Sequence, residues 1–155
     1  MNVPSGEQCL EILKNNGTPS NIIEHCKTVA RVAGKIADKL IERGKNVNKG
    51  LVIAGALLHD IERDKDNHVI RGAKLVKKLG YPDVARVISK HTLYNLKNNE
   101  PKTIEEKIVF YADKRAKNDK IVSLEERYKD IKERYKVNLN LEMEFTKKIE
   151  KELLG

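Results

Sequence analysis

The sequence predicts an all-α fold, and three features of the 155-residue chain agree on this. Apolar residues recur at helical spacing through most of the chain, and no convincing segment shows the two-residue period of a strand. Hydrophobic residues make up 39% and charged residues 35%, which is ordinary for a helical globular protein and too apolar for a disordered one. A chain of this length fits one domain and can bury a core of its own.

The first two helices are expected over residues 5–14 and from about residue 18 to residue 43. The first ends at an Asn-Asn-Gly turn, and the second opens around Pro19, since proline is favoured in the first turn of a helix. Gly44 follows the second helix, in the position where glycine commonly ends helices. The expected inward stripe of that helix consists of Ile22, His25, Val29, Val32 or Ala33, Ile36 and Leu40.

The next helix, about residues 48–61, is apolar nearly all round in its LVIAGALL run, so it is expected in the centre of the domain. It ends in the pair His59-Asp60, and a charged loop follows over residues 62–66. Two helices separated by a glycine come next, over residues 67–79 and from about 81 to 91.

The rest of the chain is expected to contain a polar loop over residues 92–102 and a helix over residues 103–117. From about residue 121 the apolar positions become sparse among many charges, which indicates a C-terminal helical pair that packs on the core or faces a partner. The expected organisation is a single domain over residues 1–155, with a compact core of five to six helices over about 18–120 and a helical extension over 121–155.

The formal net charge is +8, from 31 Lys and Arg against 23 Asp and Glu. Basic and acidic residues are interleaved along the expected helices, which is typical of a solvated helix face, so a nucleic-acid partner is not expected. No segment approaches the roughly 18 uninterrupted apolar residues that span a bilayer, and the N-terminus lacks the pattern of a signal peptide. We therefore expect a cytoplasmic protein without membrane contact, and the sequence allows a homo-oligomer.

All four histidines occupy positions where an apolar stripe would place a core residue. A single inward histidine is more often part of a core or a helix end than a ligand. Burying four imidazoles beside two inward carboxylates, Asp60 and Asp113, is nevertheless costly unless something compensates. A divalent cation would compensate, because imidazole and carboxylate are donors that such ions prefer. The pattern of His25, then His59-Asp60 after 34 residues, then Asp113 after another 53, therefore indicates a metal site.

This pattern resembles the HD superfamily of metal-dependent phosphohydrolases, which is named for its His…His-Asp…Asp ligands. The resemblance covers roughly residues 20–120, and its matching residues are His25 in NIIEHCKTVARVAGKIA, His59 and Asp60 in AGALLHDIERDK, and Asp113 in IVFYADKRA. Many members continue the pair as His-Asp-Ile-Gly-Lys. Here Glu62 departs from the glycine, and Arg63 stands where a catalytic-site lysine often lies.

Two further segments are similar to the branch of the superfamily that binds two metal ions: the HVIRGA run with His68, and the VISKHT run with His91. The segment 91–113 looks like the bacterial members that split diadenosine tetraphosphate symmetrically. The resemblance implies an all-α fold of the HD type. It also implies a first ion held by His25, His59, Asp60 and Asp113, and a second held by His68 and His91 with Asp60 bridging.

The cofactor implied by the resemblance is one or two divalent ions, with Fe or Mn favoured and Zn, Mg, Ni or Co allowed by the donor set. Asp60 then has a catalytic role, and Arg63 either stabilises charge on the phosphate or is a solvated loop residue. Lys114 and Arg115 are candidates for substrate binding. They flank the inward Asp113 at angles that point elsewhere, which favours surface positions for both.

The function favoured by this pattern is phosphohydrolysis, in which metal-activated water cleaves a phosphoester or phosphoanhydride bond of a nucleotide or dinucleoside polyphosphate. The expected partner is therefore a small phosphorylated substrate. No Gly-x-Ser-x-Gly elbow, P-loop or dinucleotide motif supports a rival chemistry. The alternative is a non-catalytic regulatory or binding module that its metal stabilises, with the charged C-terminal helices as its working surface. A non-specific nucleic-acid binder would rest on the charge alone.

Overall fold

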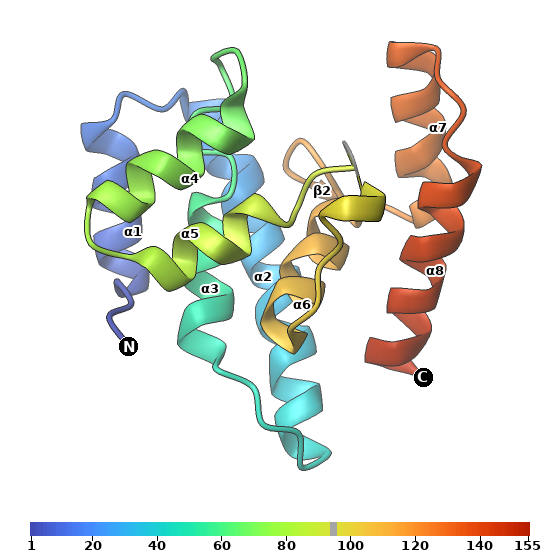
Figure 1. The fold of residues 1–155 in the computed structure, drawn as a ribbon, viewed down its shortest axis with the longest axis horizontal. Coiled ribbons are helices and arrows are strands. Elements are labelled where there is room, and N and C mark those ends of the chain that lie inside the picture. Colours follow the sequence, from blue (N-terminus) through green and yellow to red (C-terminus); the bar gives the residue numbers. More distant parts are fainter. Residues whose placement is uncertain (94–95) are drawn as a thin grey trace.

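A computed structural model describes residues 1–93 and 96–155 of the protein, and it is built almost entirely of helices (Figure 1). The prediction of an all-α fold is confirmed. The described elements in chain order are α1 (Gly6–Asn15), α2 (Ser20–Glu42), α3 (Lys49–Leu58), α4 (His68–Lys78), α5 (Pro82–Ser89), the 3-10 helix η1 (Leu96–Asn98), α6 (Ile104–Lys114), β1 (Ala116–Lys117), β2 (Lys120–Ile121), α7 (Leu124–Tyr135) and α8 (Asn140–Leu154).

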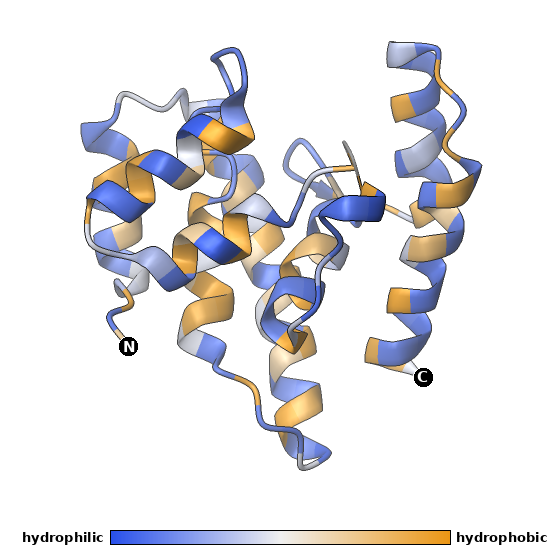
Figure 2. Ribbon diagram, in the orientation of Figure 1, coloured by the Kyte–Doolittle hydropathy of each residue, from blue (hydrophilic) through white to orange (hydrophobic). Residues whose placement is uncertain are grey.

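Helix α3 lies at the centre of the fold, as its apolar sequence predicts (Figure 2). It contacts α1, α2, α5 and α6, and between residues 51 and 58 only Ile53 is partly exposed. The long helix α2 packs along both α3 and α6. The start of α2 thereby meets the ends of α3 and α6, and the predicted ligands are located at this meeting point.

Two helix ends differ from the sequence prediction. Helix α3 ends at Leu58 rather than near residue 61, and the chain continues in turns. The side chains of Asn16 and Thr18 donate hydrogen bonds of 3.2 and 3.0 Å to the carbonyl of Ile61 and hold it beside the end of α1. These bonds come from residues more than 40 positions away, so helical periodicity alone does not reveal them.

Helix α6 ends at Lys114 rather than at residue 117, and a small antiparallel hairpin of β1 and β2 follows it. Asn118 turns this hairpin with a φ of 55°, a conformation that asparagine adopts more readily than most residues. Strands of two residues are too short to show a period in the sequence. Part of the predicted loop over 92–102 forms η1, and residues 94–95 of that loop lie outside the described residues.

Helices α7 and α8 form the predicted C-terminal pair at one end of the molecule, where α7 is drawn above α8 (Figure 1). The pair packs on α6 and α2. The buried hydroxyl of Tyr128 on α7 lies 2.5 Å from that of Thr146 on α8. Phe145 of α8 meets Phe110 of α6 edge to face, with ring centroids 5.7 Å apart. These contacts fix the position of α7 relative to the end of α6.

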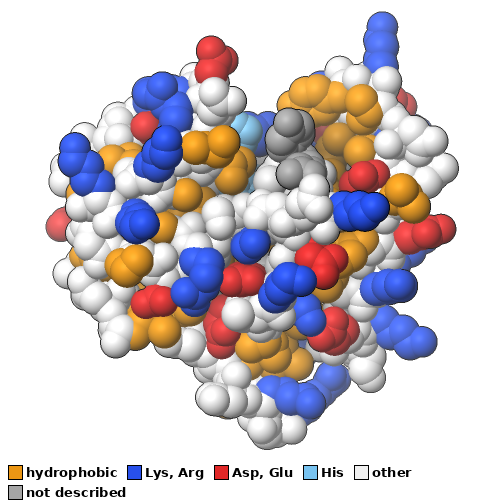
Figure 3. All heavy atoms as spheres, in the orientation of Figure 1, with side chains coloured by type: hydrophobic (Ala, Val, Ile, Leu, Met, Phe, Trp, Pro, Cys, Tyr) orange, Lys and Arg blue, Asp and Glu red, His pale blue; other side chains and the backbone are white. Residues whose placement is uncertain are grey.

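On the face drawn in Figure 3, basic and acidic side chains are intermixed, as the sequence pattern predicts. Mixed charges of this kind are typical of helix faces in contact with water. Among the described residues, no helix combines the length and the apolar character needed to cross a lipid bilayer.

Gly55 allows α3 and α5 to approach closely, since a Cβ at this position would lie 2.6 Å from Cγ1 of Val87. Val87 is fully buried and β-branched, so it has little freedom to move. We expect Gly55→Ala to lower the free energy of unfolding by about 1–3 kcal/mol, despite the better helix propensity of alanine. Gly50 is exposed, and the nearest atom to a Cβ there would be 3.6 Å away. Gly50→Ala should therefore raise the free energy of unfolding by up to about 1 kcal/mol. Urea denaturation measures both, and effects of the same sign would contradict the close packing.

Candidate metal centre

Two histidines and two aspartates meet where the start of α2 reaches the ends of α3 and α6. His25 lies in the second turn of α2, His59 and Asp60 directly follow α3, and Asp113 lies in the last turn of α6. The Nε2 atoms of His25 and His59 each lie 3.2 Å from Oδ1 of Asp113. The same atoms lie 3.5 and 3.4 Å from Oδ2 of Asp60. One donor atom from each residue therefore lies within 4.8 Å of the others, a spacing that a single metal ion can bridge.

Three imidazoles at this site are oriented by backbone carbonyls on their outer side. The bonds run from Nδ1 of His59 to the carbonyl of Ala56 (2.6 Å), from Nδ1 of His91 to that of Ile88 (2.7 Å), and from Nδ1 of His25 to that of Asn118 (2.9 Å). A carbonyl oxygen only accepts hydrogen bonds, so Nδ1 carries the proton in each ring. The Nε2 atoms are left to face the carboxylates, which is the arrangement of histidines that bind metal ions in proteins.

The electrostatic surroundings favour a cation here. His59, His91 and Asp113 lie at the C-terminal ends of α3, α5 and α6, and this end of a helix carries a partial negative charge. Burial opposes a charge on His59, but Asp60 and Asp113 outweigh it and hold the pKa of this imidazole well above its ordinary value. Burial by itself would raise the pKa of Asp60, because it disfavours the charged carboxylate. The neighbouring imidazoles of His59 and His91 instead hold this pKa well below its usual range. A divalent ion would supply the positive charge that the carboxylates otherwise draw from the imidazoles.

Asp60 also belongs to a second group of donors, together with His68 at the start of α4 and His91 after α5. Nε2 of His91 lies 3.4 Å from Oδ1 of Asp60, and the centroids of the His68 and His91 rings are 6.5 Å apart. Oδ1 of Asp60 is buried and accepts no hydrogen bond within the described part of the chain. An unsatisfied buried oxygen of this kind is costly, and a second cation among these three residues would satisfy it. The residues present thus fit one or two divalent ions.

Lys114 is buried, so the surface position suggested by its place in the helix is wrong. Its Nζ donates hydrogen bonds to Oδ2 of Asp113 (2.6 Å) and to the carbonyl of His91 (2.8 Å). Burial lowers the pKa of Lys114, while the charge of Asp113 opposes this shift. The ammonium group therefore neutralises Asp113 from the side away from the two histidines that face Oδ1.

Arg115 points away from the histidines and aspartates. Its guanidinium donates hydrogen bonds to the carbonyl of Val122 (2.6 Å) and to the hydroxyl of Tyr111 (2.8 Å). It also pairs with Glu150 of α8 at 4.0 Å. The structure thus does not bring Arg115 to the candidate metal centre.

The loop after Asp60 shows how Glu62 can replace the glycine that many HD proteins have there. The backbone at Glu62 does not adopt a positive φ. This position therefore does not require glycine. Its carboxylate accepts hydrogen bonds from Lys65 (2.9 Å) and from Asn16 at the end of α1 (3.1 Å), which ties the loop to the core. Arg63 is exposed, and no hydrogen bond or ion pair joins its guanidinium to another described residue.

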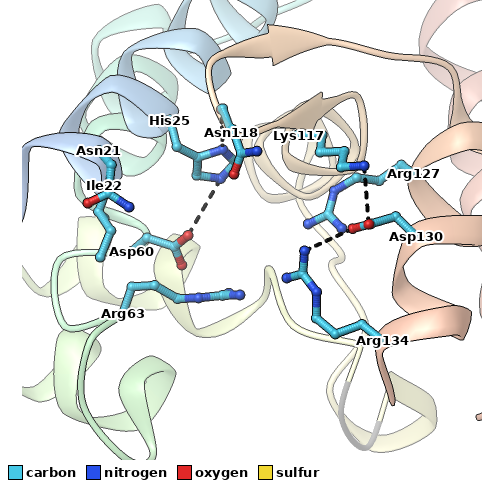
Figure 4. A pocket seen from close by; sticks show the side chains of 10 residues that line it. All are labelled: Asn21, Ile22, His25, Asp60, Arg63, Lys117, Asn118, Arg127, Asp130 and Arg134. Carbon is cyan, nitrogen blue, oxygen red and sulfur yellow. Dashed lines mark hydrogen bonds and ion pairs between the residues drawn. The ribbon is translucent and has the colours of Figure 1, made fainter. Parts of the chain in front are cut away.

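A cavity of about 220 Å³ opens beside His25 and Asp60 (Figure 4). Its opposite wall comes from the β1–β2 hairpin and α7, and Arg63 extends toward it from the side of Asp60 (Figure 4). The remaining cations that line it are Lys117, Arg127 and Arg134. Sequence analysis did not identify these three, because a charged helix has the same pattern whether it faces solvent or a cavity.

A second cavity of about 500 Å³ opens on the other side of the site, beside His68 and His91. It shares three arginines with the first cavity: Arg63, Arg127 and Arg134. The rest of its lining is largely apolar and includes Val69, Leu93, Ile131, Tyr135, Val137 and Leu139. The second cavity thus adds an apolar wall to the arginines that the two cavities share.

The chain is similar to several known proteins. It is 38% identical over 140 residues to the tRNA (cytidine(56)-2′-O)-methyltransferase of Picrophilus torridus, covering 80% of this chain and 40% of that protein. It is 31% identical over 144 residues to an uncharacterized protein of Methanocaldococcus jannaschii, covering 83% of this chain and 85% of that protein. It is 32% identical over 111 residues to the dihydroneopterin 2′,3′-cyclic phosphate phosphodiesterase of the same organism, covering 59% of this chain and 44% of that protein.

A family model described as the HD domain matches residues 22–118, more than half of the chain. This segment contains all six predicted metal ligands, and it ends before α7 and α8. The chain spans only 40% of the length of the methyltransferase relatives, and no solved structure matches it. The family predicted from the His…His-Asp…Asp pattern is confirmed, and the chain belongs to the HD domain family.

Proposed function

We propose that this protein is a metal-dependent phosphohydrolase that cleaves a phosphoester or phosphoanhydride bond of a nucleotide or dinucleoside polyphosphate. The observation that carries the proposal is the set of three oriented imidazoles facing two buried carboxylates, next to a cavity with four cationic side chains. His25, His59, Asp60 and Asp113 would hold one divalent ion, and Asp60, His68 and His91 a second. Such an ion acts as a Lewis acid that makes a water molecule more acidic and polarises a phosphoryl group.

The protein's own side chains would bind and orient the phosphate. Arg63 supports this role because it is exposed at the edge of the site and lines both cavities. Its planar guanidinium can donate two parallel hydrogen bonds to phosphate oxygens, which strengthen as negative charge develops there. Lys114 is held by Asp113 and the carbonyl of His91, and Arg115 faces α8, so we assign substrate binding to neither.

The larger cavity supports a substrate that carries a heterocycle. Its apolar lining, with the half-exposed ring of Tyr135, suits a flat base, while the arginines at its edge suit the attached phosphate. The relative named as a dihydroneopterin cyclic phosphate phosphodiesterase acts, by its name, on a phosphate ester of a heterocyclic compound. The imidazole and carboxylate donors favour Fe(II) or Mn(II) and also accommodate Zn, Mg, Ni or Co.

The test is phosphate release by anaerobically purified protein supplied with Fe(II) or Mn(II). The panel contains nucleoside mono-, di- and triphosphates, dinucleoside polyphosphates and 2′,3′-cyclic nucleotides, with organic products separated by chromatography because phosphodiester cleavage releases no free phosphate. We expect hydrolysis of at least one compound that stops when the ion is removed. No hydrolysis by protein with a measured metal content would refute the proposal and favour the non-catalytic metal-stabilised module.

The two-ion arrangement makes a separate prediction for His68. We expect His68→Ala to contain about one metal ion fewer per chain and to hydrolyse substrate at least about tenfold more slowly, because the second donor group loses a ligand. Ile70→Ala is the control, since this side chain lies on the same helix and is 59% exposed. Elemental analysis measures the metal content. An unchanged content in His68→Ala would contradict the second ion and leave the four-residue site intact.

A second candidate function is action on an RNA. It is favoured by the two relatives named as tRNA (cytidine(56)-2′-O)-methyltransferases, and by the net charge of +8. Binding of transfer RNA across a range of salt concentrations tests it, because a protein that contacts several phosphates loses affinity steeply as salt rises. Absence of binding at low salt would remove this candidate.

A further inference from the structure

Helix α7 contributes cations to the cavity beside the candidate metal centre, although it lies outside the segment that the HD domain matches. Arg127 and Arg134 are seven residues apart, about two helical turns, and therefore project from one face of α7. Lys117 joins them from β1, and Arg63 faces them from the loop after α3 (Figure 4). Four cations from three parts of the chain thus surround one small cavity.

Three contacts hold Lys117, Arg127 and Arg134 in place. Nε of Arg127 donates a 2.8 Å hydrogen bond to the carbonyl of Ala116, which fixes the plane of its guanidinium. Asp130 pairs with Lys117 at 3.2 Å and with Arg134 at 3.1 Å, so one carboxylate links β1 to α7 (Figure 4). The three cations from β1 and α7 are therefore positioned before any ligand binds.

The charges around this cavity do not balance. Its lining contains four cations and two carboxylates, and one of the carboxylates, Asp60, belongs to the candidate metal centre. Asp130 alone remains to offset Arg63, Lys117, Arg127 and Arg134. Like charges gathered in a confined space repel one another, and an anion from the substrate would relieve that repulsion.

We propose that Lys117, Arg127 and Arg134, which face Arg63 across the cavity, form a subsite for a second phosphate of the substrate, next in its chain to the phosphate at the metal centre. This inference rests on the proposed function. Divalent ions and Arg63 would offset the charge of the phosphate that is cleaved, so the three additional cations across the cavity are explained by a further anionic group. The substrate class is therefore one with adjacent phosphates, which a nucleoside di- or polyphosphate and a phosphorylated oligonucleotide both provide.

The kinetic test uses Arg134→Gln, with Lys132→Gln as the matched control. Both residues are exposed on α7 and both changes remove one positive charge, but Lys132 lines neither cavity of the site. For a nucleoside diphosphate, we expect Arg134→Gln to lower kcat/KM about 10- to 100-fold, mainly through KM, as expected for loss of a charge-assisted hydrogen bond. For the corresponding monophosphate the change should stay below about threefold. Equal losses on both substrates, or the same loss in Lys132→Gln, would overturn the subsite.

A binding measurement separates the subsite from the proposed function. Calorimetry with metal-loaded protein should show inorganic pyrophosphate binding at least about tenfold more tightly than inorganic phosphate, and Arg134→Gln should abolish the preference. If no compound is hydrolysed but this preference depends on Arg134, the subsite stands and the hydrolase proposal fails. If hydrolysis occurs and wild-type protein shows no preference, the subsite is refuted and the hydrolase proposal stands.

The source of the second phosphate is resolved by two ligands measured in parallel, a nucleoside diphosphate and a 5′-phosphorylated dinucleotide. The ligand whose affinity falls in Arg134→Gln, and not in Lys132→Gln, is the one that the subsite recognises. Thermal unfolding of each variant confirms that folded proteins are compared. Affinities of both ligands that are unaffected by Arg134→Gln would overturn the inference.

Discussion

Replacing Asp60 with asparagine should reduce metal-dependent hydrolysis at least about a thousandfold, which corresponds to about 4 kcal/mol of transition-state stabilisation. Asp60 is the residue that both donor groups share. Its Oδ2 faces His25 and His59, and its Oδ1 faces His91. Asparagine keeps the shape of the side chain but removes its negative charge and leaves a single oxygen for two positions. The affinity for both ions should therefore fall, whereas loss of His68 should affect one.

The matched control for this prediction is Asp64→Asn. Asp64 lies in the same loop and loses the same charge, but its side chain is 40% exposed and contacts Lys65 rather than the histidines. Metal content and phosphate release would be measured for wild type and both variants. We expect Asp64→Asn to remain within about twofold of wild type, as is usual for an exposed residue. Retention of more than a tenth of the wild-type rate by Asp60→Asn would contradict the role assigned to this carboxylate.

The arrangement of helices followed from sequence wherever a local pattern decides the structure. The apolar LVIAGALL run predicted a central helix, and α3 is buried among four others. The end of α3 was misplaced because Asn16 and Thr18 decide it through hydrogen bonds to Ile61. Periodicity reports which face of a segment is buried, and it carries no information on bonds between distant parts of the chain.

The histidines and aspartates of the site could be predicted because the evidence lies in the residue types themselves. Imidazoles and carboxylates at inward positions require compensation, whatever the details of the fold. The cations that the β1–β2 hairpin and α7 contribute to the smaller cavity could not be predicted in the same way. Arg127 and Arg134 reach the site because Tyr128 and Phe145 dock α7 and α8 against the core, and such packing is visible only in three dimensions.

Lys114 shows the same limit at the level of one side chain. Neighbouring residues on a helix point about 100° apart, which suggested that Lys114 would diverge from Asp113. The lysine stem is long enough to fold back, and its ammonium group bonds to the adjacent carboxylate inside the protein. Helix geometry fixes the direction of Cα–Cβ, while the end of a flexible side chain goes where charge and hydrogen bonds favour it.

Replacing Lys114 with methionine should lower the free energy of unfolding by about 3–5 kcal/mol. Methionine retains an unbranched apolar stem but removes the ammonium group. Oδ2 of Asp113 and the carbonyl of His91 then lose their donor in the interior, and an uncompensated buried charge is strongly destabilising. Urea denaturation of the metal-free protein measures the effect.

Lys107 provides the comparison because it lies on the same helix and pairs with Glu152 at the surface. Lys107→Met should lower the free energy of unfolding by less than about 1 kcal/mol, since ion pairs at the surface contribute little to stability. Equal stabilities of the two variants would show that the buried ammonium group is dispensable.

Metal titration distinguishes a positioning role of Lys114 from a purely structural one. Nζ of Lys114 donates a hydrogen bond to Oδ2 of Asp113, so that Oδ1 faces His25 and His59. Without that hydrogen bond the carboxylate is free to rotate, so affinity for the ion held by Asp113 should fall about 10- to 100-fold. Affinity for the ion held by Asp60, His68 and His91 should change less, because Asp113 is not among those donors. A parallel loss of both ions would mean that Lys114 stabilises the fold as a whole rather than the orientation of Asp113.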